Sequence, residues 1–269
     1  MRIALIDNGS LEPPAHLALR EVARAISRNA GADVEAVSWR HSDAIAPAEL
    51  GGWPARTLGP WVRAHAAADE RDFVLIPFFV SPKGAIGSLL RRDLSLLCEE
   101  LGDLEFTFAD GLADGPDLAR IAADCVREAC PAANTPRPAV VVVDHGGPSA
   151  ESAAVRDRVA AQVRAELGGF ARSVAAASME SRGPHSDPLL SALLGSPGLG
   201  SGDVVVSPLF LLPGRHAGPG GDLHRITQAA GAASPGLRCR VAGLVGTHPA
   251  AAIALSGSLS RALGAAAHA

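Results

Sequence analysis

Two histidines and one glutamate in the second half of the chain have side chains that could bind a divalent metal ion or accept protons. His145 and His216 each come shortly after a long apolar run, and Glu180 follows a shorter run of small apolar residues. Two neutral imidazoles and a carboxylate suit a borderline cation such as Fe, Co, Ni or Zn. Each group is also a proton acceptor near neutral pH. The set therefore predicts a metal site, a proton-transfer site, or both.

The element that must position His216 is the run Asp203–His216, DVVVSPLFLLPGRH. Its apolar residues follow one another with almost no alternation, which is typical of a strand buried on both faces of a parallel sheet. Pro213 and Gly214 then end the run. Arg215 and His216 are therefore expected just beyond the carboxyl end of the strand, where open parallel sheets bind their ligands.

Each of the three residues also has an ordinary structural explanation. His145 could simply tolerate the backbone angles of its turn, Glu180 could be a solvated loop acid, and His216 could be a surface loop histidine. His185 or His248 could instead be the partner of one of them. Taken singly, each ordinary explanation is the stronger one. Because three such side chains are expected at one edge of one sheet and are absent from the matching positions of the first half, a shared site and the ordinary explanations carry equal weight at this point.

Alternating strands and helices with short loops predict an α/β protein with two parallel sheets, each flanked by helices on both faces. In the first half we expect strands at 2–6, 33–38, 72–80 and 104–108 and helices at 16–30, 55–68, 85–101 and 117–130. In the second half we expect strands at 139–143, 173–178, 203–212 and 237–243 and helices at 149–167, 187–194, 222–230 and from 249 onward. The Pro-rich polar segment 131–138 is predicted to be a linker.

The two halves also match in sequence, which predicts an internal repeat of roughly 130 residues. The motif IDNG that ends the first strand of the first half matches VDHG in the second, and Asp72–Pro82 matches Asp203–Pro213 without a gap. We therefore expect two tandem modules of the same fold, at residues 1–130 and 139–269, related by internal duplication.

When the two halves are aligned, the first half has no potential metal ligands of the same types at the matching positions. Asn8, Ala85 and Arg40 take the positions of the two histidines and the glutamate. Neither an amide nor a methyl can both bind a borderline metal and take a proton. We therefore predict a degenerate, catalytically silent first module and a second module that carries the site.

The composition excludes several classes of partner. A formal net charge of -4 and a pI near 6.1 argue against a nucleic acid or an anionic membrane surface. No apolar run approaches ~18 residues, so no transmembrane helix is expected. Because the chain begins directly with a strand and not with a signal segment, we expect a cytoplasmic protein. The four cysteines form no CxxC pair and are expected to be reduced, mostly buried thiols.

Three motifs of the second half carry a resemblance to a known family. They are HGG at His145–Gly147, PLFLLPGRH at Pro208–His216 and GTHP at Gly246–Pro249. Together they resemble the sirohydrochlorin chelatase family, the CbiX-type cobalto- and ferrochelatases. The resemblance covers about residues 138 to 264, and the first half only through its repeat pattern.

This resemblance implies a lyase that inserts Co²⁺ or Fe²⁺, with Ni²⁺ as a further candidate, into sirohydrochlorin in cobalamin or siroheme biosynthesis. His145 and His216 would bind the incoming metal and accept pyrrole protons, with Glu180 assisting. The metal is then a substrate, and no organic cofactor is implied. ATP is not needed, and the sequence has no phosphate-binding loop of the Walker type. The expected partner is the tetrapyrrole, and the protein would be a monomer or a homodimer.

The peripheral carboxylates of such a tetrapyrrole would need cations at the rim of the site. Arg215, Arg182 and Arg225 are expected to supply them, with Lys83 from the first module. The face of the ring would lie in a neutral, partly apolar cleft between the two modules.

Departures from the family pattern leave other functions open. Gly147 replaces the usual serine, the flexible run Gly218–Gly221 replaces the usual acidic residues after GRH, and two-module members keep the histidines in the first module. A non-enzymatic tetrapyrrole or metal carrier built on the same fold is the main alternative. A hydrolase or transferase that uses His145 with Asp144 is a third hypothesis, but the sequence has no GxSxG motif.

Overall fold

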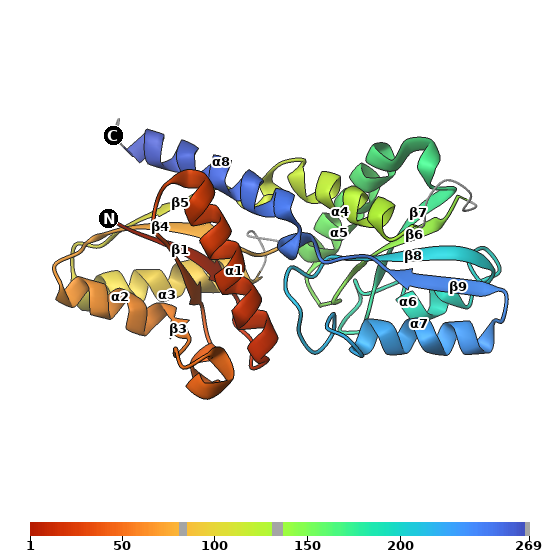
Figure 1. Cartoon of the computed structure of the whole chain (residues 1–269), viewed down its shortest axis with the longest axis horizontal. Coiled ribbons are helices and arrows are strands. Elements are labelled where there is room, and N and C mark those ends of the chain that lie inside the picture. The colour runs from red at the N-terminus through yellow and green to blue at the C-terminus, as the bar shows by residue number, and fades with distance from the viewer. Residues whose placement is uncertain (81–84, 131–136, 267–269) are drawn as a thin grey trace. The chain divides into compact units, whose positions relative to one another are not determined.

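The computed structural model describes residues 1–80, 85–130 and 137–266, and the chain groups into two compact units (Figure 1). One unit comprises Met1–Gly115 together with Pro249–Ala269, and the other comprises Pro116–His248. Each unit contains one sheet whose paired strands are all parallel. The predicted α/β class with two parallel, helix-flanked sheets is confirmed.

The first unit has a five-stranded sheet of order β3-β2-β1-β4-β5. Its strands are β1 (Arg2–Asp7), β2 (Val34–Ser38), β3 (Arg56–Thr57), β4 (Asp72–Pro77) and β5 (Glu105–Phe108). Its helices are α1 (Pro13–Ala30), α2 (Leu58–Ala67), α3 (Ala85–Leu101) and α8 (Pro249–Ala266), with short 3-10 turns η1 (Ser42–Ala44), η2 (Pro47–Leu50) and η3 (Leu112–Asp114).

The second unit has a four-stranded sheet of order β7-β6-β8-β9. Its strands are β6 (Ala139–Asp144), β7 (Ser173–Ser178), β8 (Gly202–Pro208) and β9 (Leu237–Val241). Its helices are α4 (Asp117–Glu128), α5 (Ala150–Leu167), α6 (Leu190–Leu194) and α7 (Asp222–Ala233), with 3-10 turns η4 (Gly168–Phe170) and η5 (Val245–Thr247).

The central strands of the second sheet are fixed by valine runs that are buried on both faces. Every side chain of Val140–Val143 and of Val204–Val206 is fully buried. Branched side chains of this kind pack well on a pleated surface. The two strands therefore form a rigid floor, and the residues that follow their carboxyl ends start from well-determined positions.

The two sheets repeat the same strand register, which confirms the predicted duplication. Arg2 of β1 pairs with Phe73 of β4, and Ala139 of β6 pairs with Val204 of β8. In the sequence match of the two halves, Arg2 corresponds to Ala139 and Phe73 corresponds to Val204, so corresponding residues pair in the same way in both sheets. The internal repeat is therefore present in the backbone pairing as well as in the motifs.

Strand β8 is shorter than the apolar run predicts. It ends at Pro208, whereas the expected strand extended to Leu212. Proline has no N–H to continue a ladder of hydrogen bonds, so it ends the pairing although the following residues are apolar. The corresponding strand β4 ends at Pro77 for the same reason. The residues after Pro208 form a loop that leads to His216.

The helices α4 and α8 are exchanged relative to the expected module boundaries. Helix α4, expected in the first module, packs against α5 and β8 of the second unit, and α8, expected in the second module, packs along α1 and against β4 and β5 of the first (Figure 1). An amphipathic pattern shows which face of a helix is buried but not which sheet it covers. Most of the expected linker, residues 131–136, lies outside the described residues.

No helix in the described ranges is long and apolar enough to cross a membrane. The four cysteines are free thiols, as predicted, but only Cys125 is fully buried.

Candidate metal and proton-transfer site

The candidate site lies at the carboxyl edge of the second sheet, where the strand order reverses. Strand β6 lies between β7 and β8, and this kind of switch point leaves a crevice outside the strand ends. His145 follows β6 directly, Glu180 comes two residues after β7, and His216 lies in the loop after β8. The structure therefore brings all three predicted residues to one edge.

The three side chains converge closely enough to share one cation. One ligand atom from each of His145, Glu180 and His216 lies within 4.8 Å of the others. The Nε2 atoms of the two histidines are 3.2 Å apart, and all three residues are partly buried. Tetrahedral coordination with metal–nitrogen bonds of about 2.0–2.1 Å places two nitrogens about 3.3 Å apart, so this spacing fits a shared metal.

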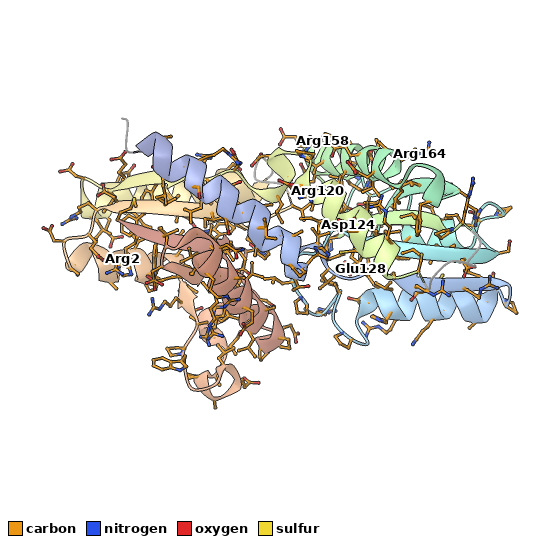
Figure 2. The ribbon with its side chains drawn as sticks, turned by 45° about the horizontal axis from the view of Figure 1, so that its top comes forward. Arg2, Arg120, Asp124, Glu128, Arg158 and Arg164 are labelled. Atoms are coloured by element: carbon orange, nitrogen blue, oxygen red, sulfur yellow. The ribbon has the colours of Figure 1, made fainter. Side chains whose placement is uncertain are left out.

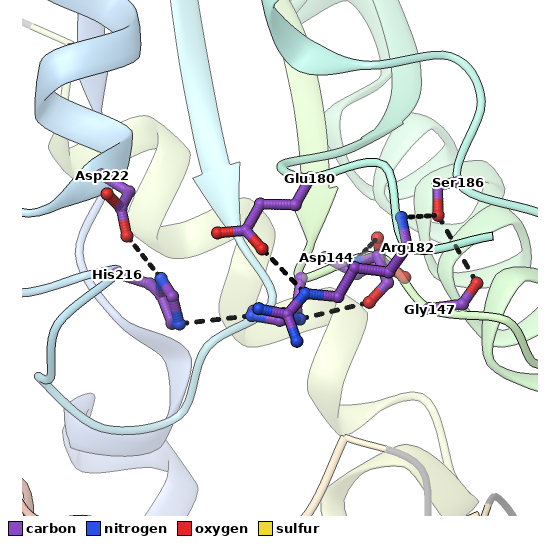
Figure 3. A network of polar contacts seen from close by, with 9 residues as sticks. Asp144, Gly147, Glu180, Arg182, Ser186, His216 and Asp222 are labelled. Carbon is purple, nitrogen blue, oxygen red and sulfur yellow. Dashed lines mark hydrogen bonds and ion pairs between the residues drawn. The ribbon is translucent and has the colours of Figure 1, made fainter.

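Hydrogen bonds at the other ring nitrogens direct both Nε2 atoms to the same point. Nδ1 of His216 lies 2.5 Å from Oδ2 of Asp222 (Figure 3), and Nδ1 of His145 lies 3.2 Å from the carbonyl oxygen of Gly146. Both oxygens accept, so each neutral imidazole carries its proton on Nδ1. Two Nε2 lone pairs then face each other, an arrangement that a proton or a cation between them would stabilise.

Asp222 is a further residue of the candidate site, and the sequence analysis missed it. It is the first residue of α7 and holds His216 in the way that carboxylates orient metal-binding histidines. Burial opposes its ionisation, but hydrogen bonds from His216 and Arg225 hold the pKa of its carboxyl below the ordinary value. The available signal was an acid six residues after the GRH motif.

The turn after β6 requires glycine because the chain passes close to the loop that carries Glu180. Gly146 has a φ of 86°, and an added Cβ would lie 2.2 Å from the carbonyl oxygen of Glu180. In the first unit Gly9 has a φ of 88° and its added Cβ would meet the carbonyl oxygen of Arg40. The expected correspondence of Glu180 with Arg40 is therefore confirmed.

A buried polar network supports this turn from below. Arg156, only 3% exposed, donates to Oγ of Ser178 at 2.7 Å, and Ser178 donates to Oδ1 of Asp144 at 2.7 Å. The same Asp144 oxygen accepts from the backbone N–H of Gly146 at 3.1 Å. Asp144 is therefore engaged in holding the turn, whereas His145 bonds to a backbone carbonyl. This geometry does not favour the hypothesis of a hydrolase that pairs His145 with Asp144.

The electrostatic environment favours neutral histidine beside an ionised glutamate. Burial lowers the pKa of His145, with Arg182 and His216 acting in the same direction and Gly146 and Glu180 opposing. The hydrogen bond from Arg182 lowers the pKa of the Glu180 carboxyl. A neutral imidazole can bind a cation or accept a proton, and the carboxylate supplies negative charge for either.

The four expected rim cations have different surroundings. Nε of Arg182 donates to Glu180 at 2.7 Å (Figure 3), and Arg225 pairs with Asp222. Arg215 is exposed, and no described carboxylate forms an ion pair with it. Lys83 lies outside the described residues. Two of the arginines thus contact the carboxylates of the site itself, and Arg215 is left to face solvent.

The alternative histidines do not join this site. His185 is exposed, and its side chain is not in the converging set. His248 belongs to a different group, with Cys125 and Glu128. Among the described residues, both groups of three potential metal ligands lie in the second unit of the structure.

Comparison with solved structures defines the class of the fold. SirB from Bacillus subtilis with Fe³⁺ is similar with a TM-score of 0.73 and 11% identity, over 97% of this chain and 96% of that one. The sirohydrochlorin chelatase SirB from Bacillus subtilis subspecies spizizenii, in complex with cobalt, has a TM-score of 0.68 and 11% identity, over 97% and 95% of the two chains. CbiX, the terminal enzyme for biosynthesis of siroheme in denitrifying bacteria, has a TM-score of 0.62 and 17% identity, over 97% and 99%. The chain therefore has the two-module chelatase fold.

Sequence comparison adds the family. Residues 139–262 match the CbiX family model. No curated protein sequence matches the chain. The resemblance that the HGG, PLFLLPGRH and GTHP motifs predicted is confirmed.

Proposed function

We propose that the protein inserts a divalent metal, Co²⁺ or Fe²⁺, into sirohydrochlorin without ATP, as a step of cobalamin or siroheme biosynthesis. The observation that carries this proposal is the facing pair of Nε2 atoms, 3.2 Å apart, on His145 and His216. The match of residues 139–262 to the CbiX family model supports it. The similar SirB structures, which hold Fe³⁺ and cobalt, support the choice of metals.

Metal insertion exchanges two pyrrole N–H protons for one M²⁺, so the site must both hold the cation and remove protons. In the proposed reaction the Nε2 atoms of His145 and His216 and the carboxylate of Glu180 bind the incoming cation. As ring nitrogens replace these ligands, the two Nε2 lone pairs become free to accept the two protons. Asp222 would stabilise the imidazolium of His216, and the Gly146 carbonyl and Glu180 that of His145.

Cations at the rim would bind the acidic periphery of the tetrapyrrole. Arg215 is the best placed of the described residues because it is exposed and adjacent to His216. Arg182 and Arg225 hold Glu180 and Asp222, so in this proposal they also keep the two carboxylates in position. Lys83 remains a predicted contact from the first module.

An absorbance assay tests the proposal. Purified protein is mixed with sirohydrochlorin and Co²⁺, Fe²⁺ or Ni²⁺ in turn, and the spectrum of the metallated product is followed against the reaction without protein. We expect catalysed conversion with Co²⁺ or Fe²⁺. A protein that binds the tetrapyrrole and never accelerates conversion with any of the three metals would instead be the carrier of the alternative hypothesis.

A further inference from the structure

A second group of side chains in the described part of the chain has the residue types of a metal site. A sulfur, a carboxylate oxygen and an imidazole nitrogen, from Cys125, Glu128 and His248, lie within 4.8 Å of one another. None of these residues belongs to the site of His145 and His216. All three lie in the second unit, so their arrangement is set within one body of the chain.

Two separate segments build this group. Cys125 and Glu128 are three residues apart on α4 and therefore lie on the same side of the helix. His248 follows η5, the turn after β9, and α4 packs against this turn. The exchange of α4 into the second unit thus brings its last helical turn to the GTHP motif, a contact that the predicted module boundaries did not anticipate.

The three donors run from the interior to the surface. The Cys125 residue is 2% exposed, whereas the side chains of His248 and Glu128 are 16% and 66% exposed. Nε2 of His248 lies 3.2 Å from Oε1 of Glu128, and Figure 2 shows Glu128 at the end of α4. A cation can reach the group from solvent by way of the carboxylate. The backbone of Gly243 lies beside the sulfur of Cys125. Even a Cβ added to Gly243 would lie 3.9 Å from Sγ, so the backbone does not crowd the sulfur.

The chemistry of these donors selects a cation of borderline softness. Thiolate and imidazole ligands favour Zn²⁺, Co²⁺ and related ions over Mg²⁺ or Ca²⁺, and a carboxylate completes many such sites. Three protein ligands leave a position for water, which is typical of sites that exchange or use their metal and not of closed structural sites. The ordinary alternative is that Glu128 and His248 form only an ion pair that fastens α4 to the turn, with Cys125 as a core residue.

We propose that Cys125, Glu128 and His248 form a second divalent-metal site in this protein, with the Cys125 thiolate as a ligand. This site uses a different set of donors from the pair of facing histidines. It therefore does not depend on whether the protein inserts metal into a tetrapyrrole.

Cobalt binding to the whole protein tests this site directly. Metal-free protein is titrated with Co²⁺ alone, without tetrapyrrole, and the near-ultraviolet sulfur-to-cobalt charge-transfer band is recorded. Such a band reports a thiolate ligand, and the site of His145, Glu180 and His216 contains no sulfur. We expect the band in the unmodified protein and in the double variant His145→Ala/His216→Ala, which separates this proposal from the proposed function.

Variants of the three ligands locate the cobalt. Cys125→Ala should lose the band, and His248→Gln and Glu128→Gln should weaken Co²⁺ binding at least about tenfold. Glu128 is mostly exposed, so its variant will fold even if Cys125→Ala does not, and circular dichroism verifies both. Cys98→Ser and Cys130→Ser serve as controls that keep the band. No charge-transfer band at saturating Co²⁺, a band that survives Cys125→Ala, or unchanged affinity in folded Glu128→Gln and His248→Gln would each overturn the proposal.

Discussion

Oδ2 of Asp222 lies 2.5 Å from Nδ1 of His216, so one carboxylate at the start of α7 sets both the tautomer and the orientation of the His216 imidazole. Asp222→Asn keeps the shape and an accepting oxygen but removes the charge. We expect metal affinity and metal-insertion rate to fall by about 10–100-fold, the usual scale for losing the partner of a metal-binding histidine. Glu151→Gln, an exposed acid of α5, is the control. Co²⁺ titration and the insertion assay measure the effect, and unchanged values would remove Asp222 from the mechanism.

The two facing histidines should each be essential for insertion. His145→Ala and His216→Ala are expected to reduce turnover by at least ~10²-fold, the scale for losing a positioned acid or base. Both residues are only partly buried, so the fold should survive. Steady-state kinetics with circular dichroism decide the matter: near-native turnover by a folded variant would show that its histidine is not used.

Arg215 should act in binding more than in chemistry. Arg215→Ala is expected to raise the KM for an acidic tetrapyrrole more than it lowers kcat, because a contact with a peripheral carboxylate is the same in the ground and transition states. Added salt should shrink the difference between the variant and the unmodified protein. If KM at low ionic strength does not change, Arg215 lies outside the binding surface.

The first unit should contain no equivalent centre. Asn8 corresponds to His145 and is exposed, and Arg40 corresponds to Glu180 and pairs with Asp93. These two positions therefore provide neither an imidazole nor a free carboxylate. We expect anomalous diffraction from crystals grown with Co²⁺ to show metal near His145 and His216 and none near Asn8. Metal bound near Asn8 with similar occupancy would contradict this assignment.

Asp7 corresponds to Asp144 in the repeat, and its carboxyl should make the free energy of unfolding depend on pH. Burial raises the pKa of its carboxyl from 3.8 to about 6, against opposing hydrogen bonds from Ser38 and Gly9. Between these values the folded protein binds more protons than the unfolded chain, so this group's contribution falls as the pH rises from about 4 to about 6. The loss is on the order of 3 kcal/mol.

Asp7→Asn removes this titration. We expect the variant to gain stability relative to the unmodified protein between pH 4 and pH 7, as measured by urea unfolding at both values. His16, whose pKa burial lowers to about 4, titrates in the opposite sense but is present in both proteins and largely cancels. Asp33→Asn, at an exposed position, is the control. A stability difference that does not change with pH would contradict the buried carboxyl's role.

Much of the fold could be predicted because the chain repeats and its central strands are continuous apolar runs. The sequence pattern predicted the buried valine strands β6 and β8 and the turn at Gly146. The predicted strand β8 was too long, because the residues after Pro208 are apolar although backbone hydrogen bonding to the neighbouring strands ends there. Two of the covering helices, α4 and α8, were assigned to the wrong sheets, since burial of one face of a helix does not identify the surface that buries it.

The potential ligands of the site could be predicted from the sequence, but the residues that hold those ligands in position could not. His145, Glu180 and His216 follow strand ends, and parallel strands present their carboxyl ends at one edge. Asp222 and Arg156 lie on helices, where a charged residue is usually a solvated one. Arg156 is instead buried beneath the turn, a role that depends on how α5 is rotated over the sheet and that no spacing in the sequence reveals.

The exchange of α4 and α8 has a consequence for any attempt to divide the chain. A cut in the segment 131–138, where the sequence repeat suggests a boundary, separates α4 from the sheet that it covers and leaves α8 attached to the wrong half. Each fragment would then expose an apolar sheet face and carry the helix that its counterpart lacks. Such fragments should be poorly soluble apart and should recover structure when co-expressed, as the two pieces of a split reporter do.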